Sequence, residues 1–218
     1  MILKTKELFD LDHTLAAPLL NECEYPHQAL PKIGEFIKEC SKALDQSYEE
    51  IFEGVFAAKD AVIWAGVTIV GPTIIGHKAE IRPGAFIRGN ALIGDGAVIG
   101  NSTEVKNAII LDGAQLPHYN YVGDSIIGYH AHMGAGSIAS NLRLDKKEIT
   151  LKSDDEILES GLRKIGVFLG DYAEVGCGAV LCPGSIVGRE AMVYPLCSVR
   201  GSVPPKTIFD GKSYKEKV

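Results

Sequence analysis

Aliphatic residues recur at every sixth position through the middle of the chain. From residue 61 to residue 114 the sequence divides without a gap into nine six-residue units, and the third residue of each unit is aliphatic. These third residues are Ile63, Ile69, Ile75, Ile81, Ile87, Ile93, Ile99, Val105 and Leu111. A helix cannot hold this spacing on one face, because at 100° per residue the six-spaced positions drift around its axis. The pattern therefore predicts short strands separated by turns.

A six-residue period is typical of a hexapeptide solenoid with a triangular cross-section. Each unit supplies one strand and one turn, three units complete one coil, and the aliphatic third residue points inward. Glycine recurs at the fourth and sixth positions, where turns need positive φ angles. We therefore predict an all-β fold, a parallel β-helix, over residues 59–203. Solenoids of this hexapeptide class are left-handed, against the usual crossover rule, so we expect a left-handed coil.

The period fails first at residues 115–124, which read QLPHYN followed by YVGD. This interpretation places Pro117 at an inward position and adds four residues before the period resumes with Ile127 and Met133. Proline cannot donate to a strand ladder. We therefore expect Pro117 to push the segment out of the coil and to display His118 on the outer wall.

A second interruption covers about residues 140–166 and is rich in charged side chains. It is expected to be either a lid that reaches a neighbouring subunit or a solvated loop. Six more units follow it, with Leu169, Val175, Leu181, Val187, Val193 and Val199 at the inward positions. The period then stops, and residues 204–218 are expected to be a basic C-terminal tail.

The first 58 residues follow a helical pattern instead. One apolar helix face is predicted from the residues Ile33, Phe36, Ile37, Cys40 and Leu44, which have the spacing of helical turns. The open edge of a solenoid needs a cover. We therefore expect residues 1–58 to be a small α-helical cap over the first coil.

Composition narrows the possible partners. The net charge of −6 and the pI near 5.5 argue against binding to nucleic acid or to anionic membranes. The five cysteines form no CxxC pair, which suits reduced thiols in a cytosol. The N-terminus has acidic residues where a signal peptide needs an apolar core. We expect a cytoplasmic protein that acts on a small molecule.

Four motifs resemble those of a known enzyme family. They are RPGA at 82–85, TEVKNA at 103–108, PHYNYVGD at 117–124 and MGAGSIASN at 133–141. Together they are similar to the C-terminal acetyltransferase domain of the bacterial bifunctional enzyme that joins glucosamine-1-phosphate acetyltransferase to N-acetylglucosamine-1-phosphate uridyltransferase. The resemblance covers about residues 61–203. It implies N-acetylation of an amino-sugar phosphate such as glucosamine-1-phosphate, without the uridyltransferase domain.

The resemblance also implies roles for single residues. His118 matches the catalytic base of the family. Four residues match positions that contact the sugar phosphate, namely Arg82, Lys106, Tyr121 and Asn141. Two positions depart from the family: His132 stands where the family has an asparagine, and Leu142 where it has a tyrosine. Both positions belong to the sugar site, so His132 is expected to alter substrate binding.

Acetyl-CoA is the co-substrate that the resemblance implies. Its extended arm is expected along the later coils, beside Ala135 and Cys177. A homotrimer with active sites between adjacent coils is likewise implied by the family, and no metal is required for the transfer.

The chemistry of acetyl transfer suits a histidine, because the attacking amine must lose a proton near neutral pH. An unperturbed imidazole has a pKa near 6.5 and can accept that proton. Arg82 and Lys106 both occupy outward fourth positions and could each give a charge-assisted hydrogen bond to a phosphate. Counting units places them one coil and one face apart, so they would converge only through a loop or across a subunit boundary.

Two other functions remain open. His77, His118, His130 and His132 allow a zinc site like that of the γ-class carbonic anhydrases, which needs three convergent imidazoles. In that alternative His130 and His132, two residues apart, lie on one face of a strand. The other alternative is a trimeric scaffold whose catalytic site has decayed.

Overall fold

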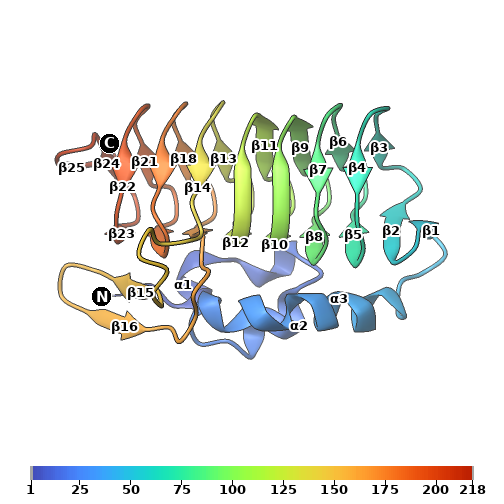
Figure 1. Cartoon of the computed structure of the whole chain (residues 1–218), viewed down its shortest axis with the longest axis horizontal. Helices are drawn as coiled ribbons and strands as arrows, with labels where there is room; N and C mark the ends of the chain where they lie inside the picture. The colour runs from blue at the N-terminus through green and yellow to red at the C-terminus, as the bar shows by residue number, and fades with distance from the viewer. Residues whose placement is uncertain (1, 218) are drawn as a thin grey trace.

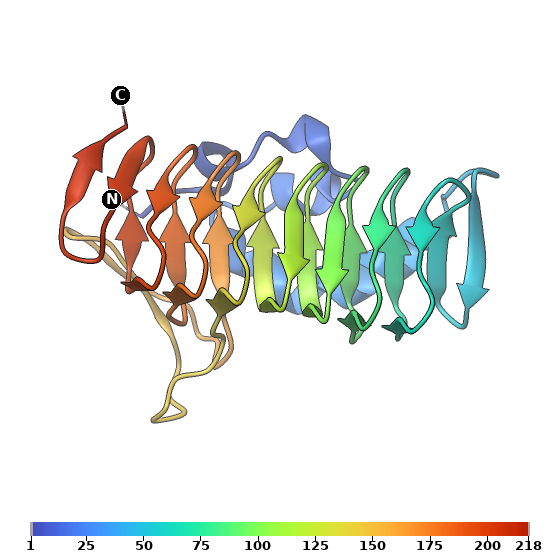
Figure 2. The same cartoon turned by 90° about the horizontal axis from the view of Figure 1, so that it is seen from above.

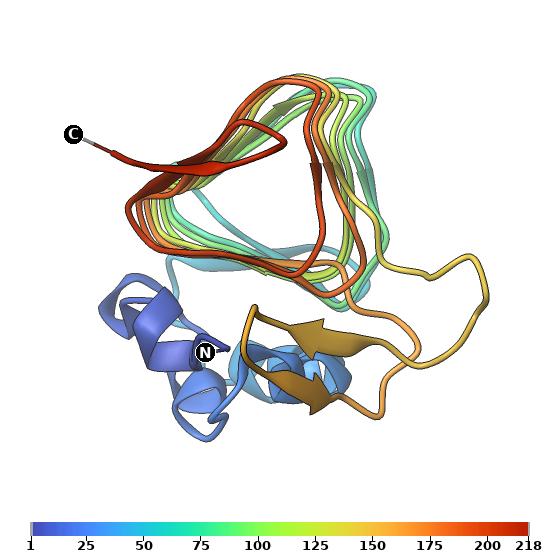
Figure 3. The same cartoon turned by 90° about the vertical axis from the view of Figure 1, so that its left-hand side faces the viewer.

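The strands of the chain wind into a parallel β-solenoid of about nine turns. The computed structural model describes residues 2–217. Figures 1 and 2 show the coils stacked along the long axis, and Figure 3 shows their triangular cross-section. In Figure 3, seen from the C-terminal end, the chain runs clockwise as it approaches the viewer, so the coil is left-handed.

Three faces form the solenoid. The first face contains β2 (Val55–Ala58), β5 (Thr73–Ile75), β8 (Ala91–Ile93), β17 (Val167–Leu169), β20 (Ser185–Val187) and β23 (Ser202–Val203). The second face contains β3 (Val62–Ile63), β6 (Glu80–Ile81), β9 (Val98–Asn101), β11 (Gln115–His118), β13 (His132–Met133), β18 (Glu174–Val175), β21 (Met192–Val193) and β24 (Thr207–Phe209). The third face contains β4 (Thr68–Ile69), β7 (Phe86–Ile87), β14 (Ile138–Ala139), β19 (Val180–Leu181) and β22 (Ser198–Val199). Two longer strands, β10 (Glu104–Ile110) and β12 (Tyr121–Ile127), run from the third face around a corner onto the first.

The inward ladder is the core that the six-residue period predicts, with two exceptions. Ile110, not Leu111, is inward, because it pairs in register with Ile93. Leu116, not Pro117, is inward and pairs with Ile99. The coil containing β10 is therefore one residue shorter than three full units. Our placement of the break at Pro117 was wrong, since the phase already shifts between Val105 and Ile110.

The N-terminal helices lie along the side of the solenoid and not over its end, which corrects the expected cap (Figures 1 and 3). They comprise α1 (Thr5–Leu8), η1 (Leu11–His13), α2 (Ala17–Asn21), η2 (Pro26–Lys32) and α3 (Ile33–Ser41). Their apolar side chains form a second core with the outward residues of the first face, including Ile74, Leu92 and Ile109. At the end of the solenoid, β1 (Tyr48–Phe52) pairs antiparallel with β2. A strand hairpin therefore pairs with the edge of the first face at this end, where we expected helices.

The charged segment between β14 and β17 folds into an arm, a name used here for residues 140–166. Its hairpin pairs β15 (Thr150–Lys152) with β16 (Ile157–Glu159). Ile149, Leu151 and Ile165 are buried in the second core, so the arm packs on its own chain beside the helices (Figure 3). The arm is therefore a packed part of the fold and not the solvated loop of the second alternative.

The C-terminal residues also form part of the fold. β24 continues the second face, and β25 (Tyr214–Glu216) pairs antiparallel with it at the last coil. Lys215 forms an ion pair of 2.9 Å with Asp210. Within residues 2–217, no helix is both long enough and apolar enough to span a lipid bilayer.

Candidate active site

Lys106, Tyr121 and Asn141, three of the predicted substrate residues, converge around Asp124 at the corner between the third and first faces. Asn141 Nδ2 donates to Asp124 Oδ2 at 2.6 Å. Lys106 Nζ lies 3.3 Å from the same oxygen, and Asn107 Nδ2 donates to Asp124 Oδ1 at 2.9 Å. The Asp124 side chain is only 7% exposed, so one buried carboxylate organises three donors.

The shortened coil explains how these side chains meet. Asn107 and Asp124 lie within β10 and β12, where these strands round the corner on consecutive coils with φ angles of 48° and 49°. Asparagine and aspartate tolerate this left-handed conformation better than other non-glycine residues do. The arm fixes the same corner, because Gly166 N donates to Asp124 O at 2.7 Å and Ile165 N donates to Asn141 O at 3.1 Å.

Tyr121 completes this cluster from the strand side. A Cβ placed on Gly123 would lie 2.5 Å from Tyr121 Oη and 2.7 Å from Asn141 Nδ2. Only glycine therefore leaves room for both polar groups over this strand. Burial raises the pKa of Tyr121, and the nearby carboxylates of Glu104 and Asp124 raise it further. The phenol is consequently protonated at neutral pH and can donate a hydrogen bond.

A cavity of about 200 Å³ adjoins the cluster, lined by Leu30, Pro31, Asn107, Asp124, Leu162, Arg163 and Lys164.

His118 lies on the second face, at the corner next to the third. It belongs to β11 and pairs in register with Asn101, so the strand ladder continues through it. The side chain is exposed, as expected, but Pro117 does not push the segment out of the coil. Proline fits the ladder here because Gly100 lies beside it without a side chain: a Cβ on Gly100 would overlap the carbonyl of Pro117.

Ala135 and Cys177 follow His118 on the next two coils. Gly136 N donates to His118 O at 3.0 Å, and Gly178 N donates to Ala135 O at 2.9 Å. The three residues are therefore stacked in one column along the solenoid, with exposed side chains at each level. The structure brings together the two residues expected for the cofactor and the expected base.

Arg82 and His132 do not join the Asp124 cluster. Arg82 lies on the second face, where its Nη2 pairs with Glu80 Oε2 at 2.9 Å. His132 is also on the second face, with Nδ1 2.9 Å from Glu174 Oε2. A corner of the coil separates both residues from Lys106, as unit counting predicted for Arg82.

The remaining histidines are held apart. His77 Nδ1 lies 2.8 Å from Asp60 Oδ1. His130 occupies a turn with φ of 50° and stacks on Tyr172, while His132 is in β13. Our placement of His130 and His132 on one strand face was therefore wrong. Among residues 2–217, no group of three or more histidine, cysteine, aspartate or glutamate side chains is arranged to hold a metal ion.

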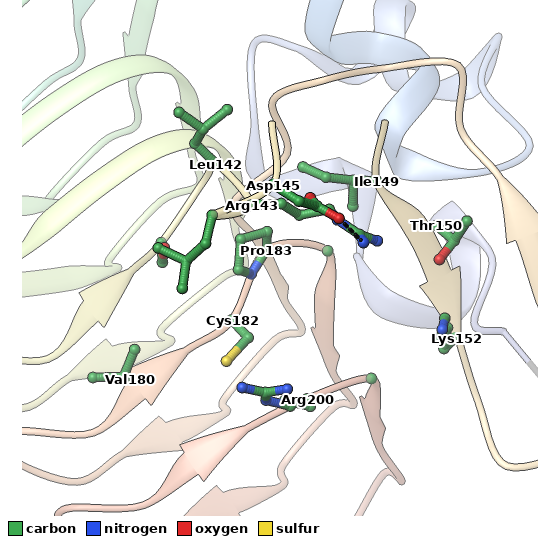
Figure 4. Close-up of a pocket in the computed structure, with 14 residues that line it drawn as sticks. Leu142, Arg143, Asp145, Ile149, Thr150, Lys152, Val180, Cys182, Pro183 and Arg200 are labelled. Carbon is green, nitrogen blue, oxygen red and sulfur yellow. Dashed lines mark hydrogen bonds and ion pairs between the residues drawn. The ribbon is translucent and has the colours of Figure 1, made fainter. Parts of the chain in front are cut away.

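A larger cavity of about 600 Å³ opens between the arm and the late coils of the third face (Figure 4). Leu142, Ile149 and Val180 supply apolar walls, and Cys182 contributes a thiol. The cations Arg143, Lys152 and Arg200 also line it. Arg143 pairs with Asp145 at 2.7 Å, whereas Lys152 and Arg200 have no ion-pair partner within residues 2–217.

Sequence reasoning missed Asp124 and Asn107 as members of the site. Asp124 ends the PHYNYVGD motif, and Asn107 follows Lys106 in TEVKNA. The available signal was an aspartate or asparagine at the end of a shortened unit, where a turn needs positive φ.

Comparison with known proteins decides the family. A family profile described as "GMPPB C-terminal domain" matches residues 69–158. An uncharacterized acetyltransferase, YaiX, of Escherichia coli is 30% identical over 164 residues, which are 75% of this chain and 70% of that protein. The chain belongs to the hexapeptide-repeat acetyltransferases.

Two further relatives of this chain are bifunctional archaeal proteins. The sugar-1-phosphate nucleotidylyltransferase/acetyltransferase of Sulfurisphaera tokodaii is 35% identical over 161 residues, 74% of this chain and 39% of that protein. The bifunctional protein GlmU of Methanococcus vannielii is 38% identical over 121 residues, 56% of this chain and 29% of that protein. The chain therefore spans well under half the length of these two relatives.

Proposed function

We propose that this acetyltransferase transfers the acetyl group of acetyl-CoA to the amine of an amino-sugar phosphate such as glucosamine-1-phosphate. The observation that carries the proposal is the cluster in which Lys106 and Asn141 contact one buried carboxylate and Tyr121 lies beside Asn141. These residue types suit a phosphorylated sugar: an ammonium for the phosphate, and an amide and a phenol for hydroxyl groups. The name of the Sulfurisphaera tokodaii relative, a sugar-1-phosphate enzyme, agrees with this class of acceptor.

His118 acts as the general base in this proposal. The neutral amine nitrogen attacks the thioester carbonyl carbon and forms the new C–N bond. The C–S bond then breaks, and CoA leaves as its thiolate, which is protonated to the free thiol. The proton lost by the amine is taken up by the His118 imidazole, whose exposed position leaves it open to a bound substrate.

The donor is proposed to lie along the column of His118, Ala135 and Cys177. In this proposal the thioester end of acetyl-CoA lies beside the base, and the pantetheine arm runs along the later coils, because the three residues are stacked on consecutive coils. We assign the phosphates of acetyl-CoA to the 600 Å³ cavity, where Lys152 and Arg200 are free of carboxylate partners among residues 2–217. A cavity of this size with apolar walls and a few cations is typical of a cofactor site.

A homotrimer is proposed to complete the site. The helices cover the first face, whereas the second and third faces carry the exposed apolar side chains of Val62, Trp64, Val70 and Phe86. Such side chains favour contact with other copies of the chain. Contact between copies would bring the second face of one subunit to the third face of another. His118 on the second face of one subunit would then lie near the Asp124 cluster at the edge of the third face of its neighbour.

A screen of amino-sugar phosphates with acetyl-CoA tests the proposal. Release of free thiol is followed for each acceptor, and the acetylated product is identified by mass spectrometry. Unphosphorylated amino sugars and acceptor-free reactions serve as controls. The proposal predicts phosphate-dependent thiol release with at least one acceptor. Thiol release no faster than in the acceptor-free control, for every compound, would contradict it.

A further inference from the structure

Asn120 carries a buried amide two residues after His118, and the residue is only 2% exposed. The pairing of β10 with β12 and of β12 with β14 places Asn120 between Thr103 on the preceding coil and Ser137 on the next. Thr103 and Ser137 have small side chains, and both are fully buried. An asparagine in this column needs partners for both ends of its amide, because a buried polar group without a hydrogen bond is costly.

Pro117 explains why a side-chain donor is useful at this corner. On the next coil, Gly134 N donates to Val175 O at 2.7 Å. Pro117 occupies the position of Gly134 one coil earlier, but it has no N–H to give to Met133 O. The Asn120 side chain supplies the missing donor: its Nδ2 donates to Gly134 O at 2.9 Å and to Met133 O at 3.4 Å.

The other end of the Asn120 amide holds the proposed base. Its Oδ1 accepts a hydrogen bond from His118 N at 3.1 Å. His118 O accepts from Gly136 N at 3.0 Å, and Tyr119 N donates to Asn101 O at 2.9 Å. The peptide groups on both sides of His118 are therefore fixed. Since the backbone sets the direction of the Cα–Cβ bond and the allowed rotamers, these contacts decide where the exposed imidazole lies.

We infer that Asn120 is a positioning residue for the general base: it spans the gap left by Pro117 and fixes His118 against the coil that carries Ala135. The inference rests on the proposed function, since it concerns the same base. Ala135 belongs to the column proposed for acetyl-CoA, so Asn120 sets the distance between the base and the thioester. A misplacement of about 1 Å can cost about 100-fold in rate.

Asn120→Ala removes the donor and the acceptor of the amide together. For the best acceptor of the amino-sugar phosphate screen, kcat is expected to fall by about 10- to 100-fold, because His118 loses its fixed orientation. KM for acetyl-CoA should stay within about threefold, since the buried Asn120 side chain does not reach the co-substrate. The midpoint of thermal unfolding, Tm, should fall by about 2–8 °C, because buried polar groups lose their partners.

Two further variants separate positioning from stability. Thr73→Ala removes a fully buried hydroxyl that donates to Val70 O at 2.8 Å, in a strand that β8 and β10 separate from β12. It should lower Tm but leave kcat within about twofold of the wild type. Pro117→Ala in the Asn120→Ala background restores an N–H opposite Met133 O. This double variant should regain part of the lost Tm, whereas kcat should stay low because the amide of His118 still lacks its acceptor.

Kinetics of the folded variants decide the inference. Wild-type kcat in Asn120→Ala, an equal loss in Thr73→Ala, or recovery of kcat in the double variant would overturn it, while the proposed function would stand. If the wild type acetylates no acceptor, the proposed function fails, and NMR of the His118 imidazole decides the inference by itself. Its Cε1–H resonance, identified by its absence in His118→Ala, should shift in Asn120→Ala and not in Thr73→Ala. An unchanged resonance in Asn120→Ala would overturn the inference.

Discussion

Asn141 donates a 2.6 Å hydrogen bond to the carboxylate of Asp124, which belongs to the preceding coil. The same carboxylate accepts from Asn107 and pairs with Lys106. The proposed acceptor site is therefore organised around a residue that sequence reasoning missed. Its burial makes the arrangement rigid, because three donors would lose their common partner if the carboxylate were removed.

Asp124→Asn is expected to weaken both the fold and acceptor binding. Asparagine can keep the positive φ at this position, so the backbone is preserved. The loss of the charged acceptor should lower the free energy of unfolding by about 1–3 kcal/mol and raise KM for the acceptor. Urea titration and steady-state kinetics measure the two effects. Asp145→Asn, at an exposed ion pair on the arm, is the control. Wild-type KM in Asp124→Asn would argue against the proposed role of the cluster.

Arg200→Ala is expected to raise KM for acetyl-CoA by about 5- to 50-fold, because a phosphate would lose a charge-assisted hydrogen bond. The KM for the acceptor should change little, since Arg200 lies in the cavity and not in the Asp124 cluster. Initial rates at varied concentrations of each substrate separate the two constants. Lys78→Ala removes a cation from a turn outside the cavity and serves as the control. An unchanged KM for acetyl-CoA would exclude the cavity as its phosphate site.

Stability is expected to fall on mild acidification because of His27. This side chain is buried at 6% exposure, and its Nδ1 has no hydrogen-bond partner among residues 2–217. Burial lowers the pKa of His27 in the folded state. The imidazole of His27 therefore binds a proton more readily in the unfolded chain than in the folded one. The contribution of neutral His27 to the free energy of unfolding is fully present above about pH 6.5 and is lost as the pH falls below that value.

Thermal unfolding between pH 5 and pH 8 measures this effect. His27→Leu should flatten the acid side of the profile, since no imidazole remains to be protonated on unfolding. His130→Leu, at an exposed turn, should leave the profile unchanged. An identical acid slope in the wild type and in His27→Leu would contradict the account.

The period-six pattern was sufficient to predict the solenoid, since most third residues of the units are in its core. It could not locate the shortened unit, because Ile109, Ile110 and Leu111 are consecutive aliphatic residues and any of them could point inward. The structure resolves the ambiguity through the second core: Ile109 and Leu111 face the helices, and Ile110 faces the coil. The period of the solenoid carries no information about that helical layer.

The candidate site is formed by side chains from adjacent coils, so its prediction required knowing which residues lie next to each other on those coils. The motifs identified Lys106, Tyr121 and Asn141, which the structure brings together. The motif arginine, Arg82, is on another face, as counting the six-residue units predicted. The strand register places Arg88 beside Lys106 on the preceding coil. The packing of the arm on the helices could not be predicted from the sequence either, since its apolar residues are scattered among charged ones.

The role of His118 is the claim on which the proposed mechanism depends. The most direct test is the rate of acetyl transfer by His118→Ala under saturating acetyl-CoA and acceptor, with His130→Ala as an exposed-histidine control. Loss of a general base lowers turnover by about 100- to 10,000-fold. We expect a loss of that size for His118→Ala, near-wild-type turnover for His130→Ala, and unchanged thermal unfolding for both. Undiminished turnover in a folded His118→Ala protein would contradict the mechanism.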